Sequence, residues 1–365
     1  MKCKYLFLIS VFVAGLSICV TGCQKTNRFE ISDQAEFYVL RNNGITGYCM
    51  EDGLPQVVSN SNVEVVKTSI NPVVHRAELE NRYLLFSEDD FPKGYKEAVV
   101  SVDFKKGVIR YKKTDHCAYT TAGSSSSYYY AVTSGAETLV CVYNPELEEV
   151  KHLKLDSSIV LSDFTASSNQ VITIGTDYGE TMYENGISTY INRLVSFEEN
   201  EDFSFHPILE LDKNMDRQYW LQDTIVKEGY LYSPSPGWRD NTTKERIMNG
   251  SLYRYDLNRG EGDFFKLDVE GPMNTFDIGD DYLAVTHEQS TAQRFGFTIF
   301  NYETCQNEYI DLERVDVEEV VMDIKRLNEN TLLVLTSKQL FGYDLYTGQI
   351  TFQMNSDASF HIWLQ

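Results

Sequence analysis

The chain has 365 residues, of which 32 are basic and 54 acidic, and its formal net charge at pH 7 is −22. This acidity disfavours nucleic acid and anionic lipid headgroups as partners, because phosphate groups are bound by basic surfaces. The length and a hydrophobic content of 42% are sufficient for one large core, and we expect no second domain.

Residues 1–22 have the pattern of an export signal. Lys2 and Lys4 give a positive start, and residues 5–18 form an apolar stretch shorter than the roughly 20 residues of a membrane-spanning helix. The sequence Val-Thr-Gly then precedes Cys23, which resembles the lipobox of bacterial lipoproteins. The resemblance implies cleavage before Cys23 and lipid on its sulfur and amine. The alternative is a plain secretory signal followed by an accidental cysteine.

Residues 23–35 are expected to be the lipidated cysteine and a short polar tether, and residues 36–365 the folded domain. Loss of residues 1–22 leaves 30 basic and 54 acidic residues, a net charge of −24 that suits solubility at a cell surface. Two or more acyl chains give stable anchoring. We therefore predict an extracytoplasmic protein that is lipid-anchored to the bacterial cell membrane or envelope.

The folded domain has four scattered cysteines that form no C-x-x-C pair, namely Cys49, Cys117, Cys141 and Cys305. We therefore expect no disulfide framework.

A five-residue turn recurs along the folded domain. Its clearest form is Asp-Leu-Tyr-Thr-Gly at 344–348, where the Asp side chain can accept hydrogen bonds from nearby amides and the Gly supplies a positive φ. Related turns begin at positions 103, 144, 196, 256 and 301, and a degraded one begins at 49. Spacings from 41 to 60 residues are typical of propeller blades with insertions.

An apolar run of strand length precedes each turn, at 83–86, 128–132, 171–174, 230–232, 282–285 and 332–335. These runs are nearly continuous instead of alternating, which is typical of strands buried on both faces. The pattern predicts an all-β chain folded as a β-propeller with seven four-stranded blades, with six or eight blades as alternatives.

Two similar strings indicate how the ring closes. Tyr-Trp-Leu-Gln at 219–222 precedes a blade strand, whereas Ile-Trp-Leu-Gln at 362–365 ends the sequence. We expect the second string to be the inner strand of a blade that begins at 37–40, so that the N- and C-terminal strands pair and close the ring. The alternative is a chance similarity of four residues.

The predicted binding site lies on the face of the propeller that carries the long loops 87–97, 175–188, 233–250 and 287–294. Long loops on a rigid scaffold commonly carry binding sites, and aromatic residues beside arginine anchor interfaces or stack on sugars. The candidate ligand- or partner-binding residues are Tyr178, Tyr183, Trp238, Arg239, Asp240, Arg246, His287, Gln289 and Arg294. The alternative is that these loops are tolerated insertions, with Trp238 covering a blade edge.

The sequence contains no clear motif for catalysis or for metal binding. The six histidines show no H-E-x-x-H pattern, the acidic runs at 88–90 and 198–202 lack calcium-loop spacing, and no G-x-S-x-G or P-loop string is present. We therefore predict no metal site and no catalytic residue, although a carboxylate pair for glycoside hydrolysis is not recognisable in sequence.

Residues 340–352, Leu-Phe-Gly-Tyr-Asp-Leu-Tyr-Thr-Gly-Gln-Ile-Thr-Phe, resemble the quinoprotein-type propeller repeat, and residues 251–260 share it in part. The family's usual Trp at the end of the next strand is Phe352 here. The resemblance implies a propeller, in a family that contains cofactor-dependent dehydrogenases and lipoprotein scaffolds without cofactor. No position matches a quinone-binding residue, so we expect no cofactor.

Together these features predict a non-catalytic module for protein or ligand recognition, or a scaffold, with a protein or glycan partner on the long-loop face. A carbohydrate-binding or carbohydrate-active propeller, similar to a glycosidase or lyase, is the alternative. In that case Tyr178, Tyr183 and Trp238 would be stacking platforms. A cofactor enzyme is a third hypothesis.

Overall fold

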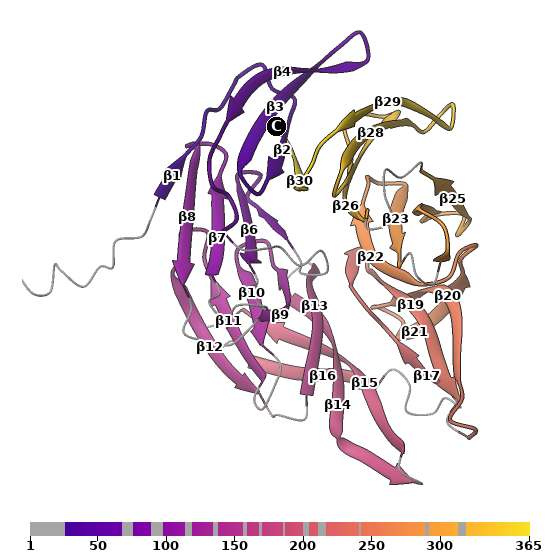
Figure 1. Cartoon of the computed structure of the whole chain (residues 1–365). Helices are drawn as coiled ribbons and strands as arrows, with labels where there is room; N and C mark the ends of the chain where they lie inside the picture. Colours follow the sequence, from indigo (N-terminus) through magenta and orange to yellow (C-terminus); the bar gives the residue numbers. More distant parts are fainter. Residues whose placement is uncertain are drawn as a thin grey trace, which may run out of the picture.

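The structure is a computed structural model, and it describes residues 26–67, 76–88, 98–113, 119–133, 138–155, 159–167, 170–184, 187–199, 204–210, 217–240, 242–288, 292–312 and 319–365. These residues form a β-propeller whose sheets stand around a central axis (Figure 1). Among them, no helix is long and apolar enough to span a membrane.

Two sheets contain the first strands of the described chain. One has the order β30 (Ser359–Leu364), β2 (Phe37–Arg41), β3 (Gly44–Glu51) and β4 (Leu54–Ser61). The other has the order β5 (Ala77–Leu79), β6 (Tyr83–Glu88), β7 (Ala98–Asp103), β8 (Val108–Lys113) and β1 (Thr26–Arg28). The segment expected to be a tether thus contributes β1, which pairs with the outer edge of β8.

The third sheet has eight strands in two halves. One half contains β9 (Tyr119–Ser124), β10 (Tyr129–Thr133), β11 (Thr138–Tyr143) and β12 (Glu149–Leu155). The other contains β13 (Ile159–Ser167), β14 (Gln170–Glu184), β15 (Ile187–Glu198) and β16 (Ser204–Glu210). A parallel pairing of Phe164 in β13 with Gly123 in β9 joins the halves.

Three further sheets complete the described molecule. The fourth contains β17 (Arg217–Trp220), β18 (Ile225–Lys227), β19 (Tyr230–Asp240), β20 (Arg246–Asp256) and β21 (Glu261–Lys266). The fifth contains β22 (Pro272–Asp277), β23 (Tyr282–His287), β24 (Gly296–Asn301) and β25 (Asn307–Asp311). The sixth contains β26 (Val321–Arg326), β27 (Thr331–Thr336), β28 (Gln339–Asp344) and β29 (Gln349–Asn355).

The prediction of seven four-stranded blades closed into a ring is wrong. The described residues form six hydrogen-bonded sheets, and hydrogen bonds do not join these sheets into a closed ring. The repeated turns predict how many strand units follow one another along the chain, but they carry no information on which units share a sheet. The pairing of β9 with β13 joins two such units into one sheet. Within the first sheet described above, β30 does pair with β2, so that Trp363 lies opposite Tyr38 and Ile362 opposite Val39.

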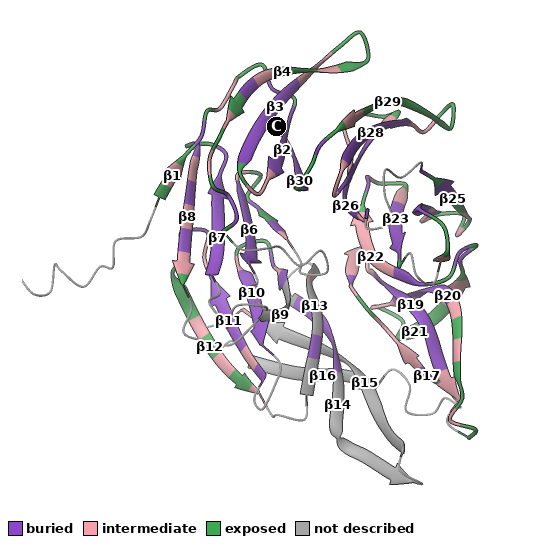
Figure 2. Ribbon diagram, in the orientation of Figure 1, coloured by how far each residue is buried: buried purple, intermediate pink, exposed green. Residues whose placement is uncertain are grey.

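The core lies between sheets, which explains the continuous apolar runs. Strands β6, β7 and β10 are buried along their whole length, whereas the outer strands β4, β12 and β29 are largely exposed (Figure 2). Side chains of β2 and β30 pack on those of β27 and β28, with Phe37, Ile362, Leu333 and Leu340 in one cluster. The inner strands of the sheets therefore surround the axis, and their ends form two opposite faces.

The repeated turn has the predicted geometry. Asp344 Oδ1 accepts hydrogen bonds from the amides of Tyr346 at 2.9 Å and Thr347 at 2.7 Å, and Gly348 has a φ of 68°. The turns at 103, 256 and 301 repeat these bonds, and in the last the positive φ falls on Cys305.

Candidate functional site

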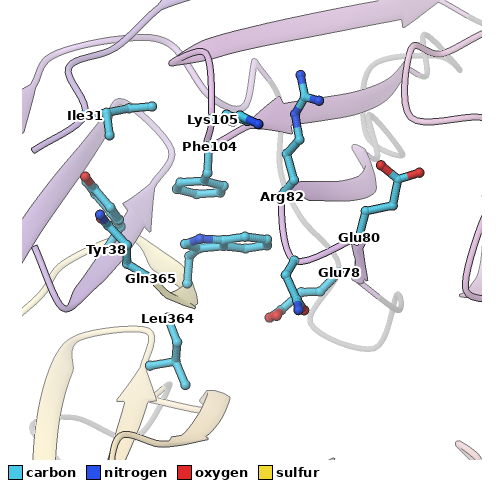
Figure 3. A pocket seen from close by; sticks show the side chains of 11 residues that line it. Ile31, Tyr38, Glu78, Glu80, Arg82, Phe104, Lys105, Leu364 and Gln365 are labelled. Atoms are coloured by element: carbon cyan, nitrogen blue, oxygen red, sulfur yellow. The ribbon is translucent and has the colours of Figure 1, made fainter. Parts of the chain in front are cut away.

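A cavity of about 660 Å³ lies between the sheet of β30 and β2 and the sheet of β5 to β8 (Figure 3). It opens on the face that carries the β5–β6 and β7–β8 turns. Its lining combines aromatic and charged side chains with the end of β30. The lining residues are Ile31, Tyr38, Glu78, Glu80, Asn81, Arg82, Phe104, Lys105, Trp363, Leu364 and Gln365.

The aromatic part of the cavity is built by the packing of two sheets. The ring of Trp363 stacks on that of Phe104 with centroids 4.3 Å apart and planes 4° apart, and Phe104 also contacts Tyr38 and Phe29. Because all four belong to one buried cluster, this wall is rigid.

The charged part of the cavity comes mainly from two turns. Arg82 is fixed, since its Nε and Nη2 donate to the two carboxylate oxygens of Asp103 at 3.0 and 2.8 Å. Burial opposes ionisation of Asp103, but Arg82 outweighs it and lowers the pKa of that carboxyl. Glu80 and Lys105 are exposed at the rim. The cavity thus offers both signs of charge beside an aromatic wall.

A charged network lies next to the cavity, near the axis of the propeller. His361 on β30 directs Nε2 to Glu78 of β5, 3.1 Å away, and Nδ1 to Asp323 of β26, 2.7 Å away. Lys325 on β26 lies 2.6 Å from Glu78. Asp323 also accepts the amide of Ile362 at 2.8 Å. The network therefore links inner strands of three sheets.

The two acids of this network are held ionised. Burial raises the pKa of Glu78, but Lys325 and then His361 outweigh it and lower the pKa to about 2. The pKa of Asp323 is also lowered, because His361 and Lys325 outweigh its burial. Glu78 keeps 35% of its side-chain exposure because it borders the cavity, whereas His361 and Asp323 keep 3% each. Such paired charges hold strands together but do not donate protons near neutral pH.

A smaller cavity of about 330 Å³ opens on the same face, between the fourth and fifth sheets. Lys227 on its wall contacts Asp277 at 3.2 Å and Asp280 at 3.3 Å. Tyr230, Tyr232 and Tyr302 form its aromatic part.

The four predicted site residues from the expected loop at 233–250 belong to strands. Trp238, Arg239 and Asp240 are the last residues of β19, and Arg246 begins β20, so the long loop expected at 233–250 is largely a β-hairpin. Pro236 falls at a register shift between Ser235 and Gly237, and such a bulge lets a strand contain proline.

Trp238 is 8% exposed, and the guanidinium of Arg217 lies 4.0 Å from its ring centroid. This position agrees with the alternative that Trp238 covers a blade. Arg246 lies over Trp220 at 5.4 Å, and Asp240 accepts the amides of Thr242 and Thr243 in its own turn.

The remaining candidates occupy several places. His287 on β23 is buried; its Nδ1 lies 3.0 Å from the carbonyl of Glu270 and its Nε2 2.7 Å from Thr298 Oγ1, and burial lowers its pKa to about 4. Arg294 pairs with Asp311 and lies over Tyr309. Tyr178 and Tyr183 lie within β14, where a loop was expected at 175–188. Their side chains and Gln289 lie outside the described part of the chain.

The predicted residues whose side chains the structure describes are therefore not brought into one site. Both cavities open on the face of the short turns, opposite to the face predicted from loop length. Sequence reasoning missed Glu78, Arg82, Phe104 and Lys105 because they sit in short turns or strands. The one sequence signal for this cavity was the string Ile-Trp-Leu-Gln at 362–365, which placed Trp363 on an inner strand.

Among the described residues, one group of side chains could hold a metal ion. Cys141, Glu149 and His152, on the paired strands β11 and β12, have potential ligand atoms within 4.8 Å of one another. Cys49, Cys141 and Cys305 form no disulfide bond in the part of the chain that the structure describes.

Neither a protein-family model nor a curated protein matches the chain. Among solved structures, dihydro-heme d1 dehydrogenase NirN in complex with DHE is similar with a TM-score of 0.52 and 9% identity, over 92% of this chain and 76% of that one. BamB from Moraxella catarrhalis has a TM-score of 0.46 and 12% identity, over 92% of both chains. Hsv2 from Kluyveromyces lactis has a TM-score of 0.44 and 12% identity, over 76% of this chain and 74% of that one.

The similarity to NirN supports the β-propeller fold and, at this identity, the fold alone. The TM-scores of BamB and Hsv2 lie below 0.5, and these two similarities carry no functional conclusion.

Proposed function

We propose that the protein is a lipid-anchored, extracytoplasmic β-propeller that binds a partner without catalysing a reaction. In this proposal residues 1–22 are an export signal, Cys23 carries the lipid, and the cavity bordered by Trp363 and Lys105 binds a protein segment or another ligand with apolar and charged groups. The long-loop face, with Trp238 and Arg239, remains a second predicted binding surface.

The observation that carries the proposal is the cavity between the sheets. Its volume, about 660 Å³, is within the range of about 300–1,000 Å³ that is usual for ligand sites. Its aromatic wall is preorganised by the stack of Trp363 on Phe104, and Glu80 and Lys105 leave charges of both signs at the rim. These features favour binding by a mixed apolar and polar surface.

The carbohydrate-active alternative requires one carboxyl group that stays protonated near neutral pH, to act as the general acid. Two acids on inner strands, Glu78 and Asp323, both have lowered pKa values. This chemistry favours binding over glycoside hydrolysis, and it leaves a glycan as one possible ligand.

The experiment places a photo-crosslinking amino acid at Glu80 or at Lys105 in cells that make the full chain. We expect adducts of one defined mass from both positions, because a ligand in the cavity contacts both rims. A crosslinker at Tyr346, an exposed residue on another sheet, is the control and should not give this adduct. Adducts that do not differ among the three positions would contradict the proposal.

The anchor is tested separately. Cys23→Ser should move the protein from the membrane fraction to the soluble extracytoplasmic fraction. An unchanged distribution would show that Cys23 is not the anchor.

A further inference from the structure

Cys141 and His152 lie opposite each other on two neighbouring strands of the third sheet. They are cross-strand partners in the antiparallel pair of β11 with β12, so their side chains leave the same face of the sheet. A thiol and an imidazole both carry atoms that bind transition metals. No short sequence motif marks this pair, because the two residues meet only when the strands pair.

A bulge in the outer strand adds a carboxylate to the pair. The register shifts so that Tyr143 lies opposite Glu149, and Val150 is the extra residue. Side chains alternate along a regular strand, so Glu149 and His152, three residues apart, would otherwise lie on opposite faces. The bulge brings both to the face of Cys141, and Glu149 Oε1 lies 3.7 Å from His152 Nδ1.

The three side chains form a compact set of sulfur, nitrogen and oxygen donors, whose potential ligand atoms lie within 4.8 Å of one another. Cys141 is fully buried and packs in one cluster with Leu85 and Val99 of the second sheet. His152 and Glu149 keep 38% and 29% of their side-chain exposure. An ion bound there would have a sulfur ligand shielded from water and would still be reached from the surface.

A tyrosine orients the carboxylate of this group. Tyr143 donates its hydroxyl to Glu149 Oε2 at 3.4 Å, which leaves Oε1 on the side of His152. Outer hydrogen bonds of this kind hold metal ligands in a productive direction. Tyr143 is therefore a positioning residue of the group and not one of its ligands.

The donor set selects among metal ions. Mg²⁺ and Ca²⁺ prefer oxygen ligands, whereas Zn²⁺ binds thiolate, imidazole and carboxylate in tetrahedral sites. Two lysines place positive charge nearby, since Lys112 holds its Nζ 5.2 Å from the centroid of the Tyr143 ring and Lys154 is exposed on the same strand as His152. They weaken simple electrostatic attraction, which favours a metal that forms strong bonds to sulfur and nitrogen.

We propose that Cys141, Glu149 and His152 bind one Zn²⁺ ion, with water as the fourth ligand. The thiol releases its proton when the metal binds, so the thiolate forms the bond and the affinity falls as the pH is lowered. The ion joins β12, the outer strand of the third sheet, to β11 and thereby fixes the edge of that sheet. This site is independent of the lipid anchor and of the cavity at Trp363.

The test is a titration of the metal-free full chain with Co²⁺, which occupies zinc sites and absorbs in the near ultraviolet when a thiolate binds it. We expect one equivalent to produce the band and Zn²⁺ to abolish it by displacing Co²⁺. Cys141→Ser should lose the band. Cys49→Ser and Cys305→Ser are the matched controls, because these thiols lie outside the group, and they should keep it.

A second variant separates metal binding from folding. His152→Asn alters a partly exposed side chain, so it should keep the circular dichroism spectrum of the wild type while its affinity for Co²⁺ falls at least about tenfold. No band in the wild type, a band that survives Cys141→Ser, or an unchanged affinity in His152→Asn would overturn the proposal.

Discussion

His361 links three sheets near the axis of the propeller. Its two ring nitrogens face carboxylates from two other sheets, Glu78 on β5 and Asp323 on β26. A buried carboxylate such as Asp323 adds little net stability while it is paired, but removing one partner of a buried pair is costly.

Asp323→Asn is therefore expected to lower the free energy of unfolding by about 3 kcal/mol, because it removes the buried carboxylate beside His361 and Lys325 and leaves Glu78 as the remaining acid of this network. Urea unfolding at neutral pH measures the change. Asp280→Asn is the control, since Asp280 pairs with Lys227 while 94% exposed, and it should change stability far less. Equal effects would mean that burial of the pair is unimportant.

The lowered pKa of Glu78 predicts how stability depends on pH. Its pKa is about 2 in the folded protein and 4.5 when unperturbed, so the unfolded state binds a proton first as pH falls. The stabilisation by this carboxylate is complete above pH 4.5 and is lost toward pH 2. Glu78→Gln should therefore flatten the acid limb of the stability curve, measured by urea unfolding at stepwise pH. Glu80→Gln, on the exposed turn, should follow the wild type.

At the scale of the element, the Asp-to-Gly turn is what the sequence predicts best, because the information is local. The side chain at the first position satisfies the amides two and three residues later, and the positive φ at the fifth position favours glycine. Cys305 shows that the turn also forms without glycine, which explains why the repeat is hard to recognise in the fifth sheet.

Asp344→Ala should lower the thermal midpoint, because two amides and the Thr347 hydroxyl lose their acceptor. Asp344→Asn keeps one oxygen for the same bonds and should lie between alanine and the wild type. Thermal unfolding followed by circular dichroism measures the order of the three proteins. An unchanged midpoint for alanine would show that the turn does not depend on its side chain.

The long hairpins β14–β15 and β19–β20 were not predictable from local patterns. Most of their distal residues are polar, aromatic, glycine or proline, which is typical of loops, yet cross-strand pairing continues as far as Arg239 opposite Arg246. Strand length there is set by the partner strand, and this information lies outside the window in which a periodicity is read.

At the scale of the whole molecule, the chain predicts a propeller but not the number of its sheets. The pairing of β30 with β2 followed from one string around Trp363, whereas the pairing of β13 with β9 had no signal. The cavity was also beyond prediction, because Phe104 and Trp363 are far apart in the chain and meet only when two sheets pack.

Trp363→Ala should lower the free energy of unfolding by about 4 kcal/mol, because it removes a large buried ring and its stack on Phe104. Hydrogen exchange should then speed up first in β30 and β2. Trp363→Phe retains an aromatic ring and should lower the free energy of unfolding by less than half as much. If exchange accelerated equally in all sheets, the β30–β2 sheet would not be a separate point of weakness.

The β2–β30 pairing also sets the order of assembly during synthesis. Phe37 and Val39 are made early, but Ile362 and Leu364, which cover their edge, follow more than 300 residues later. Until then β2 presents an unpaired, apolar edge of the kind that recruits foreign strands. Nascent molecules of this protein should therefore depend on chaperones that shield such an edge until β30 has been made.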